Sequence, residues 1–244
     1  MTEADMLKYY AKRASLYDKE AKWIAKDIEL LKLHRRAAGN SRFQKVLDVA
    51  TGTGIIGSLF GARAGEVVGI DISKSMLKHA RGRIGNLIIG TGESLPFLDN
   101  SFDLVLCRQG LHYMNPRVTL REFYRVCNGR ILISQIVCFK KTDSKWWWQV
   151  FRALSPGRKH VFTGDSLRRL IESAGFSEIS CLTFTTRNSV GDWSKSLANK
   201  TERTRLLRGF HDAPHAIKEL YNFNFTEDDC LYDEPWVIYT GHKN

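Results

Sequence analysis

The chain contains 244 residues, of which 43% are hydrophobic and 11% aromatic, and it carries a formal net charge of +11. These values exclude a disordered chain and allow the core of one α/β domain. The sequence has no apolar run of the ~18 residues that a membrane-spanning helix needs, and its first residues are acidic where a signal peptide is basic. We therefore expect a cytoplasmic protein without a membrane span.

Apolar residues at helical spacing predict one or two amphipathic helices over residues 5–36, before Gly39-Asn40. Strands and helices alternate from there. The expected strands are 45–50 (KVLDVA), 66–70 (EVVGI), 86–90 (NLIIG), 101–108 (SFDLVLCR) and 129–139 (GRILISQIVCF). The expected helices are about 55–64, 73–84 with Ser73 as N-cap, and about 116–126. This alternation is typical of βαβ units in a parallel sheet.

The pattern changes at about residue 139. Residues 139–164 are basic and aromatic and are long for a connection, so we expect them to lie over another part of the molecule. A helix follows, with Asp165 as its cap and Gly175 at its end. The remaining elements are a strand over 177–186, a polar helical stretch over 188–233 with an acidic end, and a strand over 235–243.

These elements predict a single α/β domain over residues 1–244, a doubly wound sheet with a helical cap. The cap comprises residues 1–40 and the insertions 139–164 and 188–233. The core comprises residues 41–138, completed by 165–187 and 234–244. No internal repeat or low-complexity segment interrupts this organisation.

The five cysteines are scattered and form no C-x-x-C pair, which suits neither a disulfide framework nor a zinc ribbon. We expect free thiols, and Cys107 is interpreted as a packing residue. The basic residues are spread along the chain rather than grouped in a block. They form either solvated helix faces or a surface that attracts an anionic acceptor.

The stretch VLDVATGTGIIG contains Gly52-x-Gly54-x-x-Gly57 directly after the first strand. Glycines in this turn allow backbone N–H groups to approach a ligand closely. Asp71 ends the next strand, about 20 residues after Gly52, the spacing of a carboxylate that binds a ribose diol. These features fit a nicotinamide dinucleotide as well as S-adenosylmethionine, and a purely structural turn has the same glycines.

Three features favour S-adenosylmethionine. A helical region precedes the first strand, Asp48 stands before the glycines, and the stretch TGESLPFLDNSFDLVLCRQGLHYM follows later. With VLDVATGTG, GIDIS, GESLPF and SFDLVLCRQGLHYM in this order, residues 40–135 clearly resemble the class I S-adenosylmethionine-dependent methyltransferases. More narrowly, they resemble the branch that contains ubiquinone and menaquinone methyltransferases. The resemblance implies a Rossmann-like, seven-stranded methyltransferase sheet.

The resemblance also implies roles for single residues. The residues it assigns to the cofactor are Tyr17, Asp48, Ala50, Gly52, Gly54, Asp71, Ile72, Met76, Gly92, Glu93 and Arg108. Asp71 is expected to bind the ribose and Tyr17 to close over the cofactor. Two positions depart from the family pattern. Ala50 replaces the first glycine of the usual motif, and Thr91 stands where an aspartate commonly accepts from the adenine amino group.

Polar side chains that follow the fourth strand are candidates for catalysis. These candidates are Gln109, His112 and Tyr113, with His160 from the 139–164 insertion. His112 either contacts the acceptor or bonds to backbone at a helix start. Methyl transfer from a sulfonium needs no metal, and we expect none. His211 and His215 are four residues apart, but Pro214 interrupts their helix and no third ligand is evident.

The sequence therefore predicts a methyltransferase that acts on a small or medium-sized molecule with S-adenosyl-L-methionine as cofactor. The acceptor atom and the oligomeric state are not specified. Trp146–Trp148 either line an apolar acceptor pocket or pack in the core of the cap. The alternative is a methyltransferase that acts on RNA or on an acyl-carrier-bound substrate, with nucleic acid or an acidic carrier protein as partner. A dehydrogenase and a non-catalytic binding protein are more distant alternatives.

Overall fold

The computed structural model describes residues 7–8, 10–11, 14, 28–155, 157–194 and 200–244. Helix α3 (Ile28–Ala37) belongs to the predicted N-terminal helical region, and Gly39 follows it with φ 73°. Most of the remaining prediction for residues 5–36 lies outside the described residues. None of the helices within the described ranges is long and apolar enough to cross a membrane.

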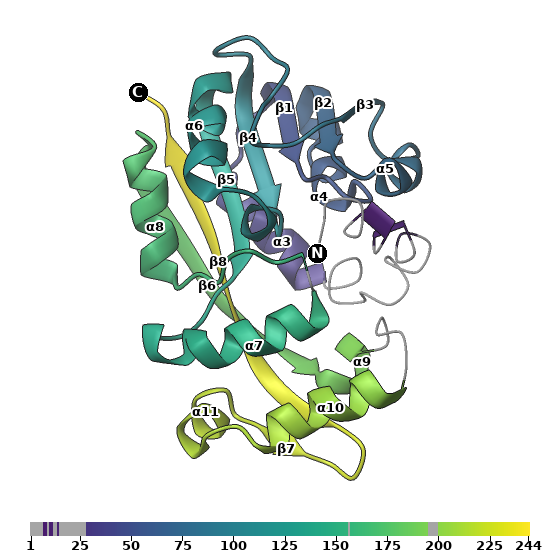
Figure 1. Ribbon diagram of the computed structural model, residues 1–244. Coiled ribbons are helices and arrows are strands. Elements are labelled where there is room, and N and C mark those ends of the chain that lie inside the picture. Colours follow the sequence, from purple (N-terminus) through teal and green to yellow (C-terminus); the bar gives the residue numbers. More distant parts are fainter. Residues whose placement is uncertain (1–6, 9, 12–13, 15–27, 156, 195–199) are drawn as a thin grey trace.

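The core is one sheet with the strand order β3-β2-β1-β4-β5-β8-β6 (Figure 1). Its strands are β1 (Phe43–Val49), β2 (Ala64–Asp71), β3 (Asn86–Ile89), β4 (Phe102–Arg108), β5 (Cys127–Ile136), β6 (Ser177–Ser189) and β8 (Cys230–His242). Strands β1 to β5 pair in parallel, whereas β8 is antiparallel to both β5 and β6. The short strand β7 (Asn224–Phe225) pairs with β8. The predicted doubly wound, Rossmann-like sheet is confirmed.

The helices cover both faces of this sheet (Figure 1). They are α4 (Ile55–Ser58), α5 (Lys74–Ala80), α6 (Pro116–Val126), α7 (Ser144–Leu154), α8 (Gly164–Ser173), α9 (Val190–Ser194), α10 (Lys200–His211) and α11 (His215–Leu220), with 3-10 turns at Gly61–Arg63, Leu111–Tyr113 and Lys141–Asp143. Ser73 caps α5 as predicted, since its side chain accepts from the Met76 N–H. Asp165 was the wrong cap for α8: Thr163 precedes the helix in extended backbone and accepts from the Ser166 N–H.

Alternating residues of β4 supply the two layers of the core. Val105 and Cys107 face one side, in the cluster that contains Leu120 and Phe123 of α6. Leu104 and Leu106 face the other side, in the cluster that contains Phe60. This alternation is the period of two that a strand imposes on its side chains. A central parallel strand is thus buried on both faces, as its continuous apolar sequence requires.

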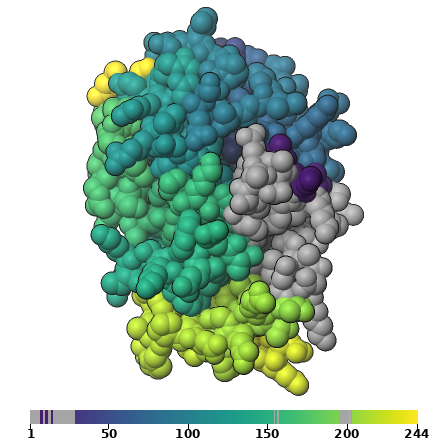
Figure 2. Space-filling model, viewed as in Figure 1, coloured from purple at the N-terminus to yellow at the C-terminus, as the bar shows by residue number. Residues whose placement is uncertain are grey.

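A third cluster lies at the cap end of the molecule, where α7, α10 and α11 surround the first half of β8 (Figure 1). Figure 2 shows the outer surface of this end, where the segment of α7 and the segment of α10 lie together. Trp147 is 1% exposed and stacks on Phe151 at a centroid distance of 4.7 Å, which places it in the core of the cap. Strands β6 and β8 continue into this region, because Ser189 pairs with Leu231. The prediction that residues 188–233 are helical was therefore wrong at both ends, where the two strands pair.

Candidate functional site

The turn after β1 contains three residues in the left-handed backbone region. Ala50, Gly52 and Gly54 have φ values of 56°, 57° and 81°. Glycine adopts this conformation without a steric penalty, whereas alanine is strained by about 1 kcal/mol. The departure of Ala50 from the family pattern therefore has a local cost. An added Cβ on Gly52 would meet no atom of the described residues within 4 Å.

Asp48 orders this turn from inside. Its Oδ2 accepts from the Thr51 hydroxyl at 2.7 Å and from the Gly57 N–H at 2.9 Å. The side chain is buried, and burial raises the pKa of Asp48 to about 7. In the structure Asp48 thus fixes the entry of α4 against the end of β1.

Asp71 joins the ends of β2 and β1. Its Oδ2 accepts from the Gly52 N–H and its Oδ1 from the Ser73 N–H, both at 2.8 Å. Burial raises the pKa of Asp71, and these two bonds counteract that rise. A carboxylate has about four acceptor positions. The Gly52 and Ser73 N–H groups use two of them.

The other residues assigned to the cofactor follow β2 and β3. Met76 is buried in α5, and Ile72 precedes that helix half-buried. Gly92 is packed so closely that an added Cβ would lie 2.8 Å from Val49 Cγ1. Glu93 Oε1 accepts from the Asn115 N–H at 2.6 Å. Thr91, where the family commonly has an aspartate, accepts from the Glu93 N–H at 3.3 Å.

Of the two remaining residues assigned to the cofactor, the structure describes Arg108 but not Tyr17. Arg108 ends β4, is 8% exposed, and places its guanidinium 5.3 Å from the centre of the Trp236 ring. Its charge also contributes, after burial, to lowering the pKa of His34 in α3 to about 3. Tyr17 lies outside the described residues. The roles assigned to both residues stay predictions.

The catalytic candidates gather beyond the ends of β4 and β5. Gln109 has φ 53°, a strained conformation that proteins retain mainly at functional sites. Gln135 links it to His112: the Gln135 amide donates to Gln109 Oε1 at 3.2 Å and lies 3.0 Å from His112 Nδ1. Gln109 Nε2 and His112 Nε2 are buried and have no hydrogen-bond partner among the residues that the structure describes.

The 139–164 insertion supplies the second wall of this polar group. The His112 carbonyl accepts from the N–H groups of Lys159 and His160 at 2.8 and 3.2 Å. The Tyr113 hydroxyl lies 2.6 Å from Ser155 Oγ. The His160 ring stacks on Phe162 at 6.0 Å, and burial lowers the pKa of His160. The structure thus brings His160 beside His112, but through backbone rather than through the ring.

Three residues of this region were not found from the sequence. Gln135 is fully buried within β5, Arg158 is 6% exposed, and Glu234 is 0% exposed in β8. Burial raises the pKa of Glu234 to about 8. The sequence groups Glu234 with Asp233 in the acidic end of the polar stretch. Successive side chains of a strand point to opposite faces of the sheet, and this alternation turns Glu234 inward where Asp233 points outward.

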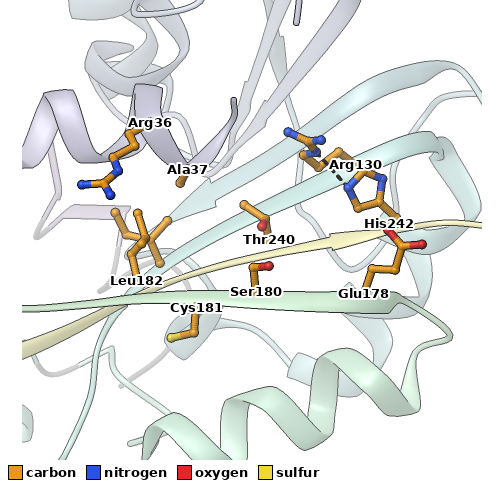
Figure 3. A pocket seen from close by; sticks show the side chains of 10 residues that line it. Arg36, Ala37, Arg130, Glu178, Ser180, Cys181, Leu182, Thr240 and His242 are labelled. Carbon is orange, nitrogen blue, oxygen red and sulfur yellow. Dashed lines mark hydrogen bonds between the residues drawn. The ribbon is translucent and has the colours of Figure 1, made fainter. Parts of the chain in front are cut away.

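A groove of about 370 Å³ lies elsewhere, between the end of α3 and strands β5, β6 and β8 (Figure 3). Arg130 and His242 line it, and Arg130 Nε donates to His242 Nε2 at 3.2 Å. Arg130 stands near the start of β5, whereas the glycine turn follows the end of β1. Since these strands are parallel within one sheet, the groove and the turn are at opposite ends. The groove is therefore separate from the candidate site.

No metal site was expected, and the described ranges contain no group of three or more His, Cys, Asp or Glu side chains placed to hold an ion. His211 contacts the Phe225 ring at 4.9 Å, and His215 Nδ1 lies 3.4 Å from Glu219. The five cysteines are free thiols, and burial raises the pKa of Cys107 to about 12. A thiol in that state is not a nucleophile at neutral pH.

The strand order, with an antiparallel strand beside β5, and the glycine turn facing Asp71 define a class I methyltransferase fold. Residues 47–133 match the family described as a methyltransferase domain. The YcgJ protein from Bacillus subtilis has a similar fold, with a TM-score of 0.81 at 18% identity over 88% of this chain and 98% of that chain.

Two relatives establish the family. A ubiquinone/menaquinone biosynthesis C-methyltransferase of Escherichia fergusonii is 35% identical over 218 residues, which cover 72% of this chain and 85% of that protein. A demethylmenaquinone methyltransferase of Corynebacterium kroppenstedtii is 30% identical over 158 residues, 56% of this chain and 69% of that protein. The chain belongs to the class I S-adenosylmethionine-dependent methyltransferases.

Proposed function

We propose that the enzyme transfers the methyl group of S-adenosylmethionine to a small or medium-sized organic acceptor, held between the ends of β4 and β5 and the 139–164 insertion. One observation carries this proposal. Gln109 and His112 have buried polar atoms that lack a partner within the described part of the chain, beside the glycine turn. Buried polar groups in this state are candidates for ligand contacts. The relatives named above act on quinone precursors by their names, which supports an aromatic ring as acceptor.

The residues present fit the cofactor. An added Cβ at Gly52 in the left-handed turn would meet no atom of the described part of the chain within 4 Å, and the carboxylate of Asp71, which accepts from the Gly52 N–H, lies next to it. Gly52, Gly54 and Asp71 are proposed to hold the cofactor, together with the half-buried Ile72. The proposal extends to the other assigned residues, which are Tyr17, Asp48, Ala50, Met76, Gly92, Glu93 and Arg108.

S-adenosylmethionine supplies a methyl group that its sulfonium has already activated. The protein then has to align the acceptor with that methyl group and exclude water, and such positioning contributes on the order of 7–11 kcal/mol. Gln109 is proposed to donate to the acceptor from its free amide nitrogen. The loop that Ser155 and the His112 carbonyl hold in place closes the acceptor side.

His112 is proposed to take a proton where the acceptor carries one. Burial lowers the pKa of His112 well below its usual value, so the ring is neutral at neutral pH. The Gln135 amide nitrogen lies 3.0 Å from His112 Nδ1 and its amide oxygen 3.4 Å, so either atom can pair with Nδ1 according to the ring tautomer. The role of base requires the tautomer in which Nδ1 carries the proton. When Nδ1 donates to the Gln135 oxygen, Nε2 is free to accept the proton from the attacking group.

The function is tested by release of S-adenosylhomocysteine from purified enzyme with pools of phenolic and quinol acceptors. We expect turnover with at least one small acceptor. We also expect His112→Ala to lower kcat by at least ~100-fold if His112 is the base, while S-adenosylhomocysteine affinity stays unchanged. His79→Ala, at an exposed position in α5, is the matched control.

The same assay examines the RNA and acyl-carrier alternative, which the relatives do not favour. A small neutral acceptor gives turnover that changes little between low and moderate salt. An RNA acceptor loses affinity steeply over the same range, because counterion release contributes to its binding. Turnover only with RNA or carrier-bound substrates, with that salt dependence and with loss in Arg35→Ala and Arg36→Ala, would overturn the proposal.

A further inference from the structure

Arg158 is a buried arginine without a counterion in the described part of the molecule. Its side chain is 6% exposed, and its Nε and Nη1 atoms are buried and have no hydrogen-bond partner there. No carboxylate of a described residue lies within 4.0 Å of it as an ion pair. An unpaired buried charge costs several kcal/mol, so proteins rarely keep one without a purpose.

The surroundings hold Arg158 in place without neutralising it. Its guanidinium lies 4.0 Å from the centre of the Phe151 ring of α7, and the backbone N–H of Arg158 donates to the Ser155 carbonyl at 3.0 Å. Stacking on an aromatic face leaves the N–H groups at the edge of the guanidinium available for a ligand. The packing therefore orients the guanidinium and leaves Nε and Nη1 without a partner among the described residues.

Arg158 belongs to the candidate acceptor region. The following residues, Lys159 and His160, both donate to the His112 carbonyl, so the loop that carries Arg158 is bound to His112. The charge of Arg158 adds to burial in lowering the pKa of His112. Its electrostatic neighbours also include Tyr113 and Glu234. The guanidinium is thus near two of the candidate catalytic residues.

Three of the unsatisfied atoms around this point are donors, and His112 Nε2 and Glu234 Oε1 also lack a partner among the described residues. Arg158 Nε and Nη1 and Gln109 Nε2 carry N–H groups, and they have no acceptor among the residues that the structure describes. Glu234, the described carboxylate among these neighbours, makes no ion pair with Arg158, and burial raises its pKa to about 8, which weakens its ability to balance that charge. A ligand that satisfies this set has to bring oxygen acceptors, and a negatively charged oxygen also compensates the charge.

We propose that Arg158 binds an oxyanion of the methyl acceptor, a carboxylate or a phenolate. This inference rests on the proposed function, because it places the anion in the acceptor region of that site. The guanidinium donates its N–H groups to the carboxylate oxygens or to the single phenolate oxygen and so orients the ring of the acceptor toward the methyl group. Arg158 would then select anionic acceptors over neutral ones of the same size.

The test uses the full chain saturated with S-adenosylhomocysteine, and benzoate, 4-nitrophenolate and the neutral benzyl alcohol as probes. We expect benzoate or 4-nitrophenolate to bind about tenfold or more tightly than benzyl alcohol, and the stronger of the two anions identifies the oxyanion. Arg158→Gln should abolish the preference, and Arg158→Lys should retain part of it, because lysine keeps the charge without the fork. Arg152→Gln, an exposed arginine on α7 whose guanidinium lies over Trp148, is the matched control and should keep the preference.

Thermal unfolding of the same proteins separates a ligand-binding role from a structural one. Because the charge is unpaired, Arg158→Gln should unfold at the same temperature as the wild type or at a higher one. If this variant does not fold, Arg158→Lys carries the test, and it should bind the anion more weakly than the wild type. Equal binding of benzoate, 4-nitrophenolate and benzyl alcohol to the wild type, or an unchanged preference in the Arg158 variants, would overturn the inference. Failure of S-adenosylhomocysteine to bind the wild type would instead contradict the proposed function.

Discussion

The contact between Gly110 and Ala50 gives a prediction that the structure fixes closely. Gly110 follows β4, and a Cβ at this position would lie 2.5 Å from the Ala50 Cβ and 2.9 Å from Cys107 Sγ. Ala50 itself has φ 56°. An alanine thus occupies the left-handed position of the cofactor turn, and a glycine opposite makes room for it.

Gly110→Ala should destabilise the protein by about 2 kcal/mol, because overpacking in a rigid core costs roughly 1–3 kcal/mol. Ala50→Gly alone should be nearly neutral. Relief of about 1 kcal/mol of backbone strain is offset by about 0.4–1 kcal/mol of unfolded-state entropy. In the Ala50→Gly background, the clash with the Ala50 Cβ is gone, and Gly110→Ala should cost only about 1 kcal/mol. The difference from its cost of about 2 kcal/mol in the wild type is a coupling energy of about 1 kcal/mol.

Urea denaturation of the four proteins measures this cycle. Gly82→Ala is the control, since a Cβ there would meet nothing within 4 Å, and it should change the free energy of unfolding by less than about 0.5 kcal/mol. Additive effects of the two substitutions, with no coupling, would refute the packing of Ala50 against Gly110.

Three further predictions concern the cofactor turn and its chemistry. Asp71→Ala should weaken S-adenosylhomocysteine binding by at least ~1.5 kcal/mol in calorimetry, the scale of a hydrogen bond to a charged group, and unchanged affinity would exclude Asp71 from the site. The raised pKa of Asp48, about 7, means that the folded chain keeps a proton that the unfolded chain loses above pH ~4. The stability that Asp48 contributes should therefore fall as the pH rises from ~4 to 7. In urea denaturation, Asp48→Asn should become more stable relative to the wild type across that range. A difference in unfolding free energy that stays constant with pH would contradict the burial of a protonated acid. Activity should survive a chelator, and loss that one divalent ion restores would point to a metal site.

The sheet was predictable because each of its parallel strands is a continuous apolar run, and because the glycine turn and Asp71 mark the ends of β1 and β2. The limits of the helical cap were harder to predict from the sequence. Strand β6 alternates exposed and half-buried residues up to Ser189, a pattern that polar helices also show in a short window. The cap of α8 was misplaced because both Thr163 and Asp165 are capping residues, and only the backbone geometry distinguishes them.

That the glycine turn and Asp71 lie together was predictable from short motifs, since both stand at the ends of neighbouring strands. The acceptor side was not, because Gln135, Arg158 and Glu234 come from β5, a loop and β8 and are joined only by tertiary packing. Arg158 also stands among other basic residues of the 139–164 insertion. Its burial against Phe151, which distinguishes it from its exposed neighbours, is a property of the folded cap.

The central claim is that the turn after β1 and the carboxylate of Asp71 bind S-adenosylmethionine. Isothermal titration calorimetry of the purified chain with S-adenosylmethionine, S-adenosylhomocysteine and NAD tests it most directly. We expect S-adenosylmethionine and S-adenosylhomocysteine to bind with one site per chain, more weakly in Asp71→Ala, and NAD not to bind. Binding of NAD without binding of S-adenosylmethionine or S-adenosylhomocysteine would contradict it.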